Sequence, residues 1–224
     1  MSSYTNSTFK NKLNKIKINT VLEIGSMHGL DAVDLLKTYN PEKIIVVECN
    51  PEGIELCKKN LSNFNNAILI ETAAWDVDTE LQFYKVTESY DNQGNPSHKN
   101  DMHKCNIGAS SCFKTNDRWP YERYVQQEIK VKARRLDRVL KEQNVSQVDL
   151  ICMDVQGAAL QALQGLGDYL NTAKAIITEL EVAPIYHGQS LYQDVTSYLK
   201  QYNFYAASIN YWSEISNDYL FLKK

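Results

Sequence analysis

The sequence predicts an α/β fold with a mostly parallel, seven-stranded sheet covered by helices on both faces. Short apolar runs bounded by turn residues alternate along the chain with helical patterns, as in proteins built from strand–helix–strand units. Most of these runs are apolar throughout, which is typical of strands that are buried on both faces of a sheet. In such sheets ligands bind at the carboxyl ends of the strands, so candidate site residues are sought there.

The first half of the chain carries three of the expected strands and two helices. Gly25 follows the first strand and Pro41 follows the first helix, while Pro51 lies where the second helix begins and a missing N–H costs nothing. Apolar residues recur three or four positions apart in both helices. In order, we expect a strand at 20–24, a helix over about 30–39, a strand at 43–48, a helix over about 51–64 and a strand at 67–70.

The second half resumes the same alternation after a polar interruption. Two β-rich pieces, 80–86 and 128–133, flank residues 87–127, which are polar and show little periodicity. A loop of this length in a compact domain is usually functional or partly disordered, and we interpret it as an inserted substrate lid. We expect one domain over 1–224 with a lead-in at 1–19. The remaining segments are a strand at 148–153, a helix at 158–164, a strand at 175–178, a helix at about 190–201, and strands at 204–208 and 219–222.

Composition bounds the class of protein. The 224 residues are 43% hydrophobic and 23% charged, which is close to the average of globular domains. No apolar run approaches the ~20 residues that span a bilayer, and the Lys-rich start has no apolar signal core. The net charge of -3 gives no overall attraction to nucleic acid, and the five cysteines form no CxxC pair. We therefore expect a cytoplasmic protein that neither spans a membrane nor binds nucleic acid.

The first candidate site is the turn from Glu23 to Gly29, between the first strand and the first helix. Gly25 and Gly29 allow the backbone to turn tightly and to approach a ligand closely. The helix that follows offers free N–H groups to a carboxylate. The spacing is GxxxG and not the GxGxxG of dinucleotide enzymes, so the turn argues against a pyrophosphate site. Turns of this kind recur in many α/β proteins.

Glu48 ends the second strand, about 20 residues after the glycines, where a carboxylate can accept both ribose hydroxyls of a nucleoside. Together the turn and Glu48 indicate a cofactor that contains adenosine. They leave S-adenosylmethionine (SAM) and NAD both open.

Short motifs follow one another in a consistent order between about residues 20 and 208. They are LEIGSMHG at 22–29, VVECNPE at 46–52, TAAWD at 72–76, GASS at 108–111, RRLDRVL at 134–140, DLICMDVQGAAL at 149–160 and ITELEVAPIYHGQSLYQDV at 177–195. Through them the chain resembles the FkbM-type family of SAM-dependent O-methyltransferases, and the MDVQGA block is the most specific part. The resemblance implies a Rossmann-like class I methyltransferase with S-adenosylhomocysteine (SAH) as its product.

The resemblance also implies which residues hold SAM. By the part of SAM that they would face, these are Glu23, Gly25, Ser26 and Gly29 for the methionine, Glu48 for the ribose, Thr72 and Ala73 for the adenine, Ser111 above the cofactor, Asp154 beside the methyl group, and His28, Cys49 and Asn50 in the surrounding wall. The family pattern more often has Asp at position 23, which keeps the carboxylate. It often has Glu at position 156, where Gln156 removes a charge.

Three residues are candidates for the chemistry. Methylation of an alcohol releases a proton, so a nearby base would help. Asp154 and Glu179 fall at the carboxyl ends of two strands, and Asp154 is the first choice. His187, in the loop after the fifth strand of the expected sheet, could act as a base near neutral pH. The alternatives are that these acids hold loops or cap helices, and that His187 is a solvated loop residue.

No metal is favoured. The spacings among His98, His103, Cys105 and Cys112 match no common zinc pattern. Asp154 and Glu179 could together bind a hard cation such as Mg²⁺, which remains an alternative.

The function expected from the resemblance is O-methylation of a hydroxyl, with a sugar of a glycan or glycoconjugate as the acceptor. Aromatic residues such as Trp119, Tyr121 and Trp212 could stack on a sugar, although packing is the commoner role of such residues. Association with a glycosyltransferase system is a further expectation. The alternatives are methylation of a small secondary metabolite, a non-catalytic SAM-binding module, and an NAD-binding oxidoreductase. A nucleic-acid methyltransferase is disfavoured because DVQG stands where an NPPY-type tetrapeptide would follow the strand.

Overall fold

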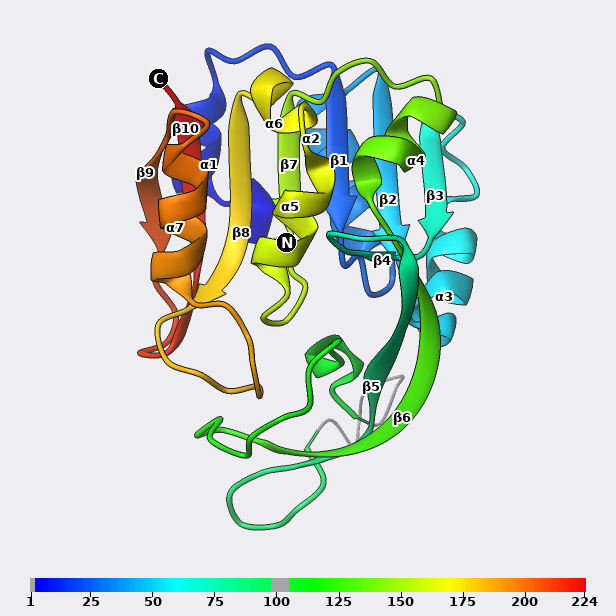
Figure 1. Ribbon diagram of the computed structural model, residues 1–224, viewed down its shortest axis with the longest axis vertical. Helices are drawn as coiled ribbons and strands as arrows, with labels where there is room; N and C mark the ends of the chain where they lie inside the picture. Colours follow the sequence, from blue (N-terminus) through cyan, green and yellow to red (C-terminus); the bar gives the residue numbers. More distant parts are fainter. Residues whose placement is uncertain (1–2, 98–104) are drawn as a thin grey trace.

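A seven-stranded sheet forms the centre of the computed structural model, which describes residues 3–97 and 105–224 (Figure 1). Neighbouring strands are parallel from one edge of the sheet as far as β8, and β10 is antiparallel to both of its neighbours. Across the sheet the strands are β3 (Ala67–Glu71), β2 (Lys43–Glu48), β1 (Thr20–Ile24), β7 (Leu150–Met153), β8 (Ala175–Glu181), β10 (Ser216–Lys223) and β9 (Phe204–Asn210). The predicted mostly parallel sheet is confirmed.

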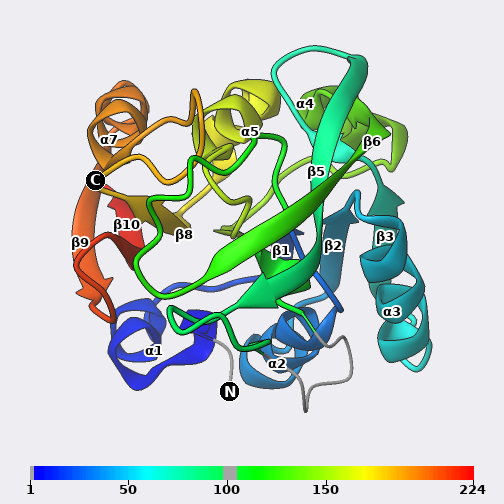
Figure 2. The ribbon, with the colours of Figure 1, turned by 90° about the horizontal axis from the view of Figure 1, so that it is seen from below.

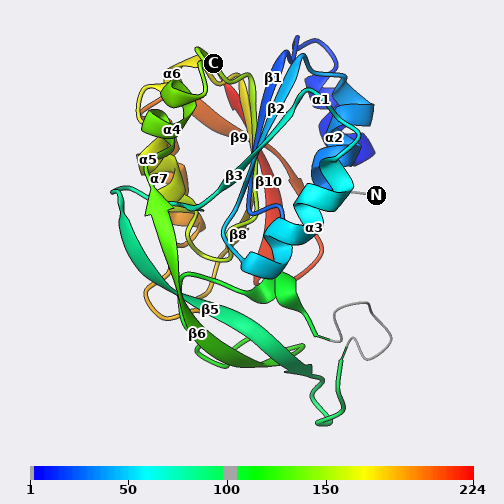
Figure 3. The same cartoon turned by 90° about the vertical axis from the view of Figure 1, so that its right-hand side faces the viewer.

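Helices cover both faces of this sheet, as predicted (Figure 3). One face carries α1 (Ser7–Leu13), α2 (Leu30–Tyr39) and α3 (Pro51–Leu61). The other carries α4 (Leu136–Glu142), α5 (Ala159–Leu166), α6 (Tyr169–Thr172) and α7 (Tyr192–Lys200). The sequence did not predict α1, α4 or α6, because helices of seven, seven and four residues are too short to show a clear apolar period.

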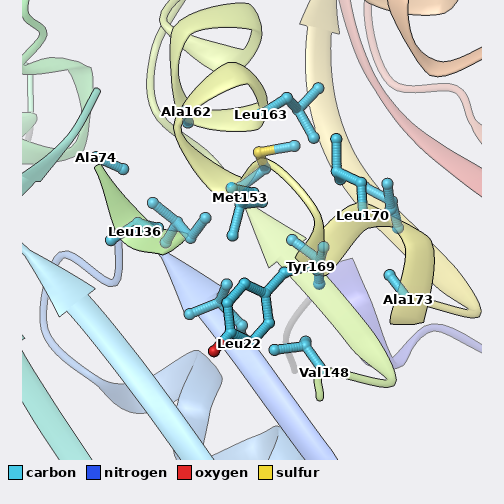
Figure 4. Close-up of a cluster of buried hydrophobic side chains, with 14 of the residues drawn as sticks. Leu22, Ala74, Leu136, Val148, Met153, Ala162, Leu163, Tyr169, Leu170 and Ala173 are labelled. Carbon is cyan, nitrogen blue, oxygen red and sulfur yellow. The ribbon is translucent and has the colours of Figure 1, made fainter. Parts of the chain in front are cut away.

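Alternation along the strands divides the apolar side chains between two cores. On β1, Leu22 and Ile24 lie in the core under α4 and α5, whereas Val21 lies in the core under α2 and α3. Figure 4 shows Leu22 and Met153 from neighbouring strands in the first of these cores, beside Leu163 of α5. The strands are therefore buried on both faces, which explains their unbroken apolar sequences.

A long two-stranded ribbon reaches beyond the sheet. It consists of β5 (Thr79–Tyr90) and β6 (Arg123–Arg134), and β6 also pairs with β4 (Ala73–Ala74), which follows closely after β3. Seen from below, the ribbon crosses the carboxyl ends of the parallel strands (Figure 2). It is thus placed to roof whatever binds at that edge of the sheet.

The expected loop at 87–127 is wrong in its extent. Strand β5 continues to Tyr90 and β6 begins at Arg123, and a short 3-10 helix, η2 (Ile107–Ala109), lies between them. The outer part of the ribbon stands away from the two main cores, so most of its side chains are polar and partly exposed. A strand with little buried surface shows no alternating apolar pattern, which is why the sequence did not reveal it.

Within the described residues, no helix combines the length and the apolar character that crossing a membrane requires.

Candidate active site

A cavity of about 590 Å³ lies at the carboxyl edge of the sheet, where the strand order reverses between β1 and β7. This position is the one that parallel sheets use for ligands. Of the predicted cofactor residues, the following line the cavity: Gly25, Glu48, Cys49, Asn50, Thr72, Ala73, Ser111 and Asp154. The structure thus brings together side chains from the ends of β1, β2, β3 and β7.

Gly25 forms the turn between β1 and the site. Its φ is +80°, a conformation that glycine adopts without strain, and its N–H donates to the Val47 carbonyl at 2.9 Å. A Cβ at this position would lie 1.9 Å from the carbonyl oxygen of Asp154. The strands β1 and β7 can therefore approach at their carboxyl ends only because residue 25 has no side chain.

Glu48 lies at the end of β2 and is almost fully buried. One of its carboxylate oxygens accepts from the N–H of Met27 at 2.6 Å, and the other accepts from the N–H groups of Cys49 and Asn50 at 2.8 and 2.7 Å. Burial raises the pKa of Glu48, and these three backbone bonds oppose the rise. A carboxylate has about four acceptor positions, so Glu48 is rigidly placed and keeps capacity for a ligand hydroxyl.

Four predicted cofactor residues do not line this cavity: Glu23, Ser26, His28 and Gly29. Glu23 points to the α2 side of the sheet, where it is fully buried and accepts from the Ser26 hydroxyl at 2.7 Å. Its other oxygen, Oε1, has no hydrogen-bond partner. Burial raises the pKa of Glu23 to about 8, and the Ser26 bond opposes the rise. Glu23 therefore supports the turn from beneath in this structure, and its contact with a cofactor stays a prediction.

The raised pKa of Glu23 makes stability depend on pH. The folded protein keeps this proton up to about pH 8, whereas the unfolded chain loses it near 4.5, so the free energy of unfolding falls as pH rises between these values. We expect Glu23→Gln to remove this part of the dependence and to be more stable than the wild type at pH 8, on the order of a few kcal/mol. Urea unfolding at pH 5, 6.5 and 8 measures it, with the exposed Glu42→Gln as control. An identical pH dependence in wild type and Glu23→Gln would contradict the assignment.

The wall opposite the sheet comes from the ribbon and from η2. Phe83 of β5, together with Ile107 and Gly108, lines the cavity, and Ser111 is anchored by backbone hydrogen bonds to Tyr84. The Ser111 hydroxyl also donates to the main-chain oxygen of Gln156 at 2.6 Å. The sequence signalled Ser111 through the GASS motif, but it could not signal Phe83, because only the tertiary path of the ribbon brings that ring over the strand ends.

A second cavity, of about 1160 Å³, adjoins the first, and both are lined by Met27, Gly108 and Asp154. Its aromatic lining residues are Trp119, Tyr121, Tyr124, Tyr186 and Trp212. Its polar lining residues are Asn106, Glu122, Asp154, Gln156 and Glu179. Asp154 therefore stands at the junction of a mostly apolar cavity and a larger cavity that is rich in aromatic and hydrogen-bonding side chains.

Three carboxyl groups gather at the ends of β7 and β8, where Glu181 is buried and Asp154 and Glu179 are partly exposed. Burial, with smaller contributions from neighbouring acids, raises the pKa of Asp154 and of Glu181 to about 7 and that of Glu179 well above its usual range. Glu179 accepts from the Ser216 hydroxyl at 2.8 Å, and Glu181 accepts from the Gln189 amide at 3.0 Å. A carboxyl group whose pKa lies near neutral pH is suited to exchange a proton with a substrate.

His187 is exposed in the loop after β8 and lines neither cavity. Its main-chain N–H donates to the Lys114 carbonyl. Its role as a base stays a prediction.

Metal binding was not favoured from the sequence. His98 and His103 lie outside the described residues, and within residues 3–97 and 105–224 no group of three or more His, Cys, Asp or Glu is arranged to hold a metal ion.

Comparison with known proteins agrees with this geometry. The family described as the methyltransferase FkbM domain matches residues 23–205. The 2-O-methyltransferase NoeI of Sinorhizobium fredii (strain NBRC 101917 / NGR234) is 27% identical over an alignment of 172 residues that covers 75% of this chain and 66% of NoeI. The chain thus spans a little under two thirds of the length of that relative.

Three solved structures of other proteins share the fold. TrmK from M. capricolum, in complex with SAH, has a TM-score of 0.51 at 10% identity over 98% of this chain and 69% of its own. Precorrin-6y C5,15-methyltransferase from Geobacter metallireducens has a TM-score of 0.51 at 10% identity over 98% and 90%. Fibrillarin from Aeropyrum pernix, with bound SAM, has a TM-score of 0.50 at 12% identity over 92% and 67%. At such identities these structures show the Rossmann-like methyltransferase fold alone.

Proposed function

Because the chain belongs to the FkbM methyltransferase domain family, we propose that it transfers a methyl group from SAM to a hydroxyl of a sugar in a glycan or glycoconjugate. The observation that carries the proposal is the junction of the two cavities at Asp154. A donor in one cavity and an acceptor in the other would meet beside a carboxylate. The O-methyltransferase NoeI, which is similar over most of this chain, supports oxygen as the acceptor atom.

The residues of the smaller cavity, called the donor cavity below, fit SAM. Glu48 is a fixed carboxylate that can accept ribose hydroxyls, and the apolar wall formed by Ala73, Phe83 and Ile107 suits a purine ring. Gly25 brings the turn close to Asp154 at the opposite end of the cavity. When bound, SAM supplies a methyl group that its sulfonium has already activated for transfer.

Asp154 is the proposed base. The proton that an acceptor hydroxyl loses on methylation would pass to the Asp154 carboxylate, whose pKa of about 7 suits this exchange. The surrounding walls would hold the acceptor oxygen in line and exclude water, which can account for roughly several kcal/mol of the barrier. Glu179, which lines the larger cavity together with Asp154, is the second candidate for the base.

The composition of the larger cavity supports a sugar as the acceptor. The rings of Trp119, Tyr121 and Trp212 lie in edge-to-face contact, with centroids 5.1 and 6.0 Å apart, and they offer apolar faces to the C–H groups of a sugar ring. Polar side chains of the same cavity, such as Asn106 and Glu122, can bind vicinal hydroxyls. Methylation of a small secondary metabolite is the alternative, and the same cavity would then hold an aglycone.

Trp212 tests the acceptor assignment. Its ring is half-exposed, and the turn that presents it is fixed by hydrogen bonds from the N–H groups of Trp212 and Ser213 to the Asn217 side chain. We expect Trp212→Ala to raise KM for a glycoside about tenfold and to leave SAM affinity unchanged, because only stacking is lost. Transfer from labelled SAM onto a panel of glycosides and small phenols measures both acceptor classes.

The matched control is Tyr205→Ala, which removes an aromatic ring of similar exposure from the edge strand β9. Transfer to phenols alone, or an unchanged KM for glycosides in Trp212→Ala, would contradict the sugar assignment. A protein that binds SAM but methylates nothing in the panel would favour the non-catalytic module.

A further inference from the structure

Gln156 occupies the centre of a hydrogen-bond network in the turn after β7. Its φ of +46° and that of Gly157, +88°, fold this turn back over the sheet edge. The amide Nε2 of Gln156 donates to Asp154 Oδ1 at 2.5 Å, and its Oε1 accepts from the Tyr186 hydroxyl at 2.7 Å. The main-chain oxygen of Gln156 accepts from Ser111 at 2.6 Å. One side chain and its backbone thus connect three loops.

The orientation of the Gln156 amide follows from its two neighbours. An ionised carboxylate only accepts hydrogen bonds, so the NH₂ group must face Asp154 and the amide oxygen must face Tyr186. The Tyr186 hydroxyl has a single proton, which it can donate to that oxygen at 2.7 Å or to the Ala109 carbonyl at 3.0 Å, and the bond to Gln156 is the shorter. In this orientation the Gln156 amide stabilises the ionised form of Asp154 and lowers its pKa, against the rise that burial causes.

Tyr186 is itself rigidly held. It is 2% exposed, and the N–H groups of Ile185 and Tyr186 both donate to Gln189 Oε1 at 2.6 Å. The Nε2 of Gln189 in turn donates to Glu181 on β8. These bonds fix the main chain at Tyr186, and burial of its ring holds the hydroxyl against Gln156.

We propose that Gln156 and Tyr186 are positioning residues. Gln156 occupies one oxygen of Asp154 and leaves the other for the acceptor hydroxyl, and Tyr186 holds the Gln156 amide in place. The inference rests on the proposed function, because Asp154 is the base of that reaction. It adds a role for Tyr186 in the loop after β8, where the only residue that the sequence singled out for the chemistry was His187. It also gives Ser111 a second role. Ser111 belongs to the wall that covers the donor cavity, and its hydroxyl is bonded to the main chain of Gln156, in the turn that holds Asp154.

The network acts within acidic surroundings. Titratable groups surround Asp154 on several elements. They are Tyr4 of η1 (Ser3–Thr5), Asp31 of α2, Glu179 and Glu181 of β8, Tyr186 of the loop after β8, and Asp218 of β10. Burial, with smaller contributions from Asp218 and Asp31, raises the pKa of Asp154, whereas the Gln156 amide lowers it. Gln156 thus keeps the base available at neutral pH.

The pH–rate profile of Gln156→Glu tests the inference. A carboxyl group 2.5 Å from Asp154 would share a proton with it, so we expect the acid limb of kcat/KM to move up by about one pH unit or more. Tyr186→Phe should lower kcat by about threefold to tenfold and leave KM for SAM unchanged, because only the bond that orients Gln156 is lost. Gln147→Glu, which makes the same charge change at an exposed position before β7, should behave as wild type.

A second measurement separates this inference from the proposed function. The Asp154 carboxyl can be titrated by NMR in protein labelled with ¹³C-aspartate and assigned with Asp154→Asn, which requires no turnover. An upward shift of that titration in Gln156→Glu supports the positioning role even if no sugar is methylated. An unshifted titration and an unshifted acid limb in folded Gln156→Glu would overturn it, whatever the acceptor.

Discussion

Asp154→Asn is expected to lower kcat by about 10²- to 10⁴-fold, the usual contribution of a positioned base, while the Kd for SAM changes little. The substitution is close to isosteric, and the Gln156 amide can still donate to the side chain at this position, because the new amide group keeps one acceptor oxygen. What disappears is the ability to take a proton. Single-turnover kinetics with labelled SAM, together with calorimetric titration of SAM, separates the two effects.

Asp168→Asn is the control for this prediction, since Asp168 is exposed at the start of α6 and caps no backbone group with its side chain. Turnover of Asp154→Asn within about a factor of three of the wild type would remove Asp154 from the role of base, since a positioned base contributes far more. Equal losses of turnover and SAM affinity would instead place it in cofactor binding alone.

Gly25→Ala is expected to produce the largest loss of stability. The added Cβ would lie 1.9 Å from the Asp154 carbonyl oxygen, and the φ of +80° disfavours any side chain. Either β1 and β7 separate at their carboxyl ends or the turn changes conformation, at a cost of about 4 kcal/mol or more. SAM binding should be lost as well, because Gly25 and Asp154 both line the donor cavity. Thermal unfolding and calorimetry measure these losses.

Gly94→Ala separates the clash from the backbone strain. Gly94 has a φ of +81°, but a Cβ there would meet no atom within 4 Å. It should therefore cost only about 1 kcal/mol, the penalty of a left-handed conformation. Similar losses for the two variants would show that the clash with the Asp154 carbonyl adds nothing to the backbone strain at residue 25.

The sheet and one side of the site were predictable from the sequence because both depend on local patterns. Residues that end consecutive parallel strands meet at one edge, which is how Glu48 and Asp154 could be assigned to a common cavity before their positions were known. The glycine turn was predictable for the same reason. Pattern and topology together determine these positions without any knowledge of side-chain packing.

The roof of the site was not predictable, because it depends on tertiary placement. The ribbon of β5 and β6 is largely polar, so no apolar alternation marks its outer half, and nothing local indicates that Phe83 faces the donor cavity. Glu23 was expected to line that cavity, but strand alternation directs it to the α2 side, under the turn. The network of Gln156 and Tyr186 joins residues 30 positions apart, a distance at which sequence patterns carry no information.

Calorimetric titration of the wild-type protein with SAM, SAH and NAD tests the central claim most directly, namely that the cavity at the ends of β1, β2 and β7 is a SAM site. We predict saturable binding of SAM and SAH, lost in Gly25→Ala and retained in Asp154→Asn, and no binding of NAD. Binding of NAD without binding of SAM would contradict the account and favour an oxidoreductase.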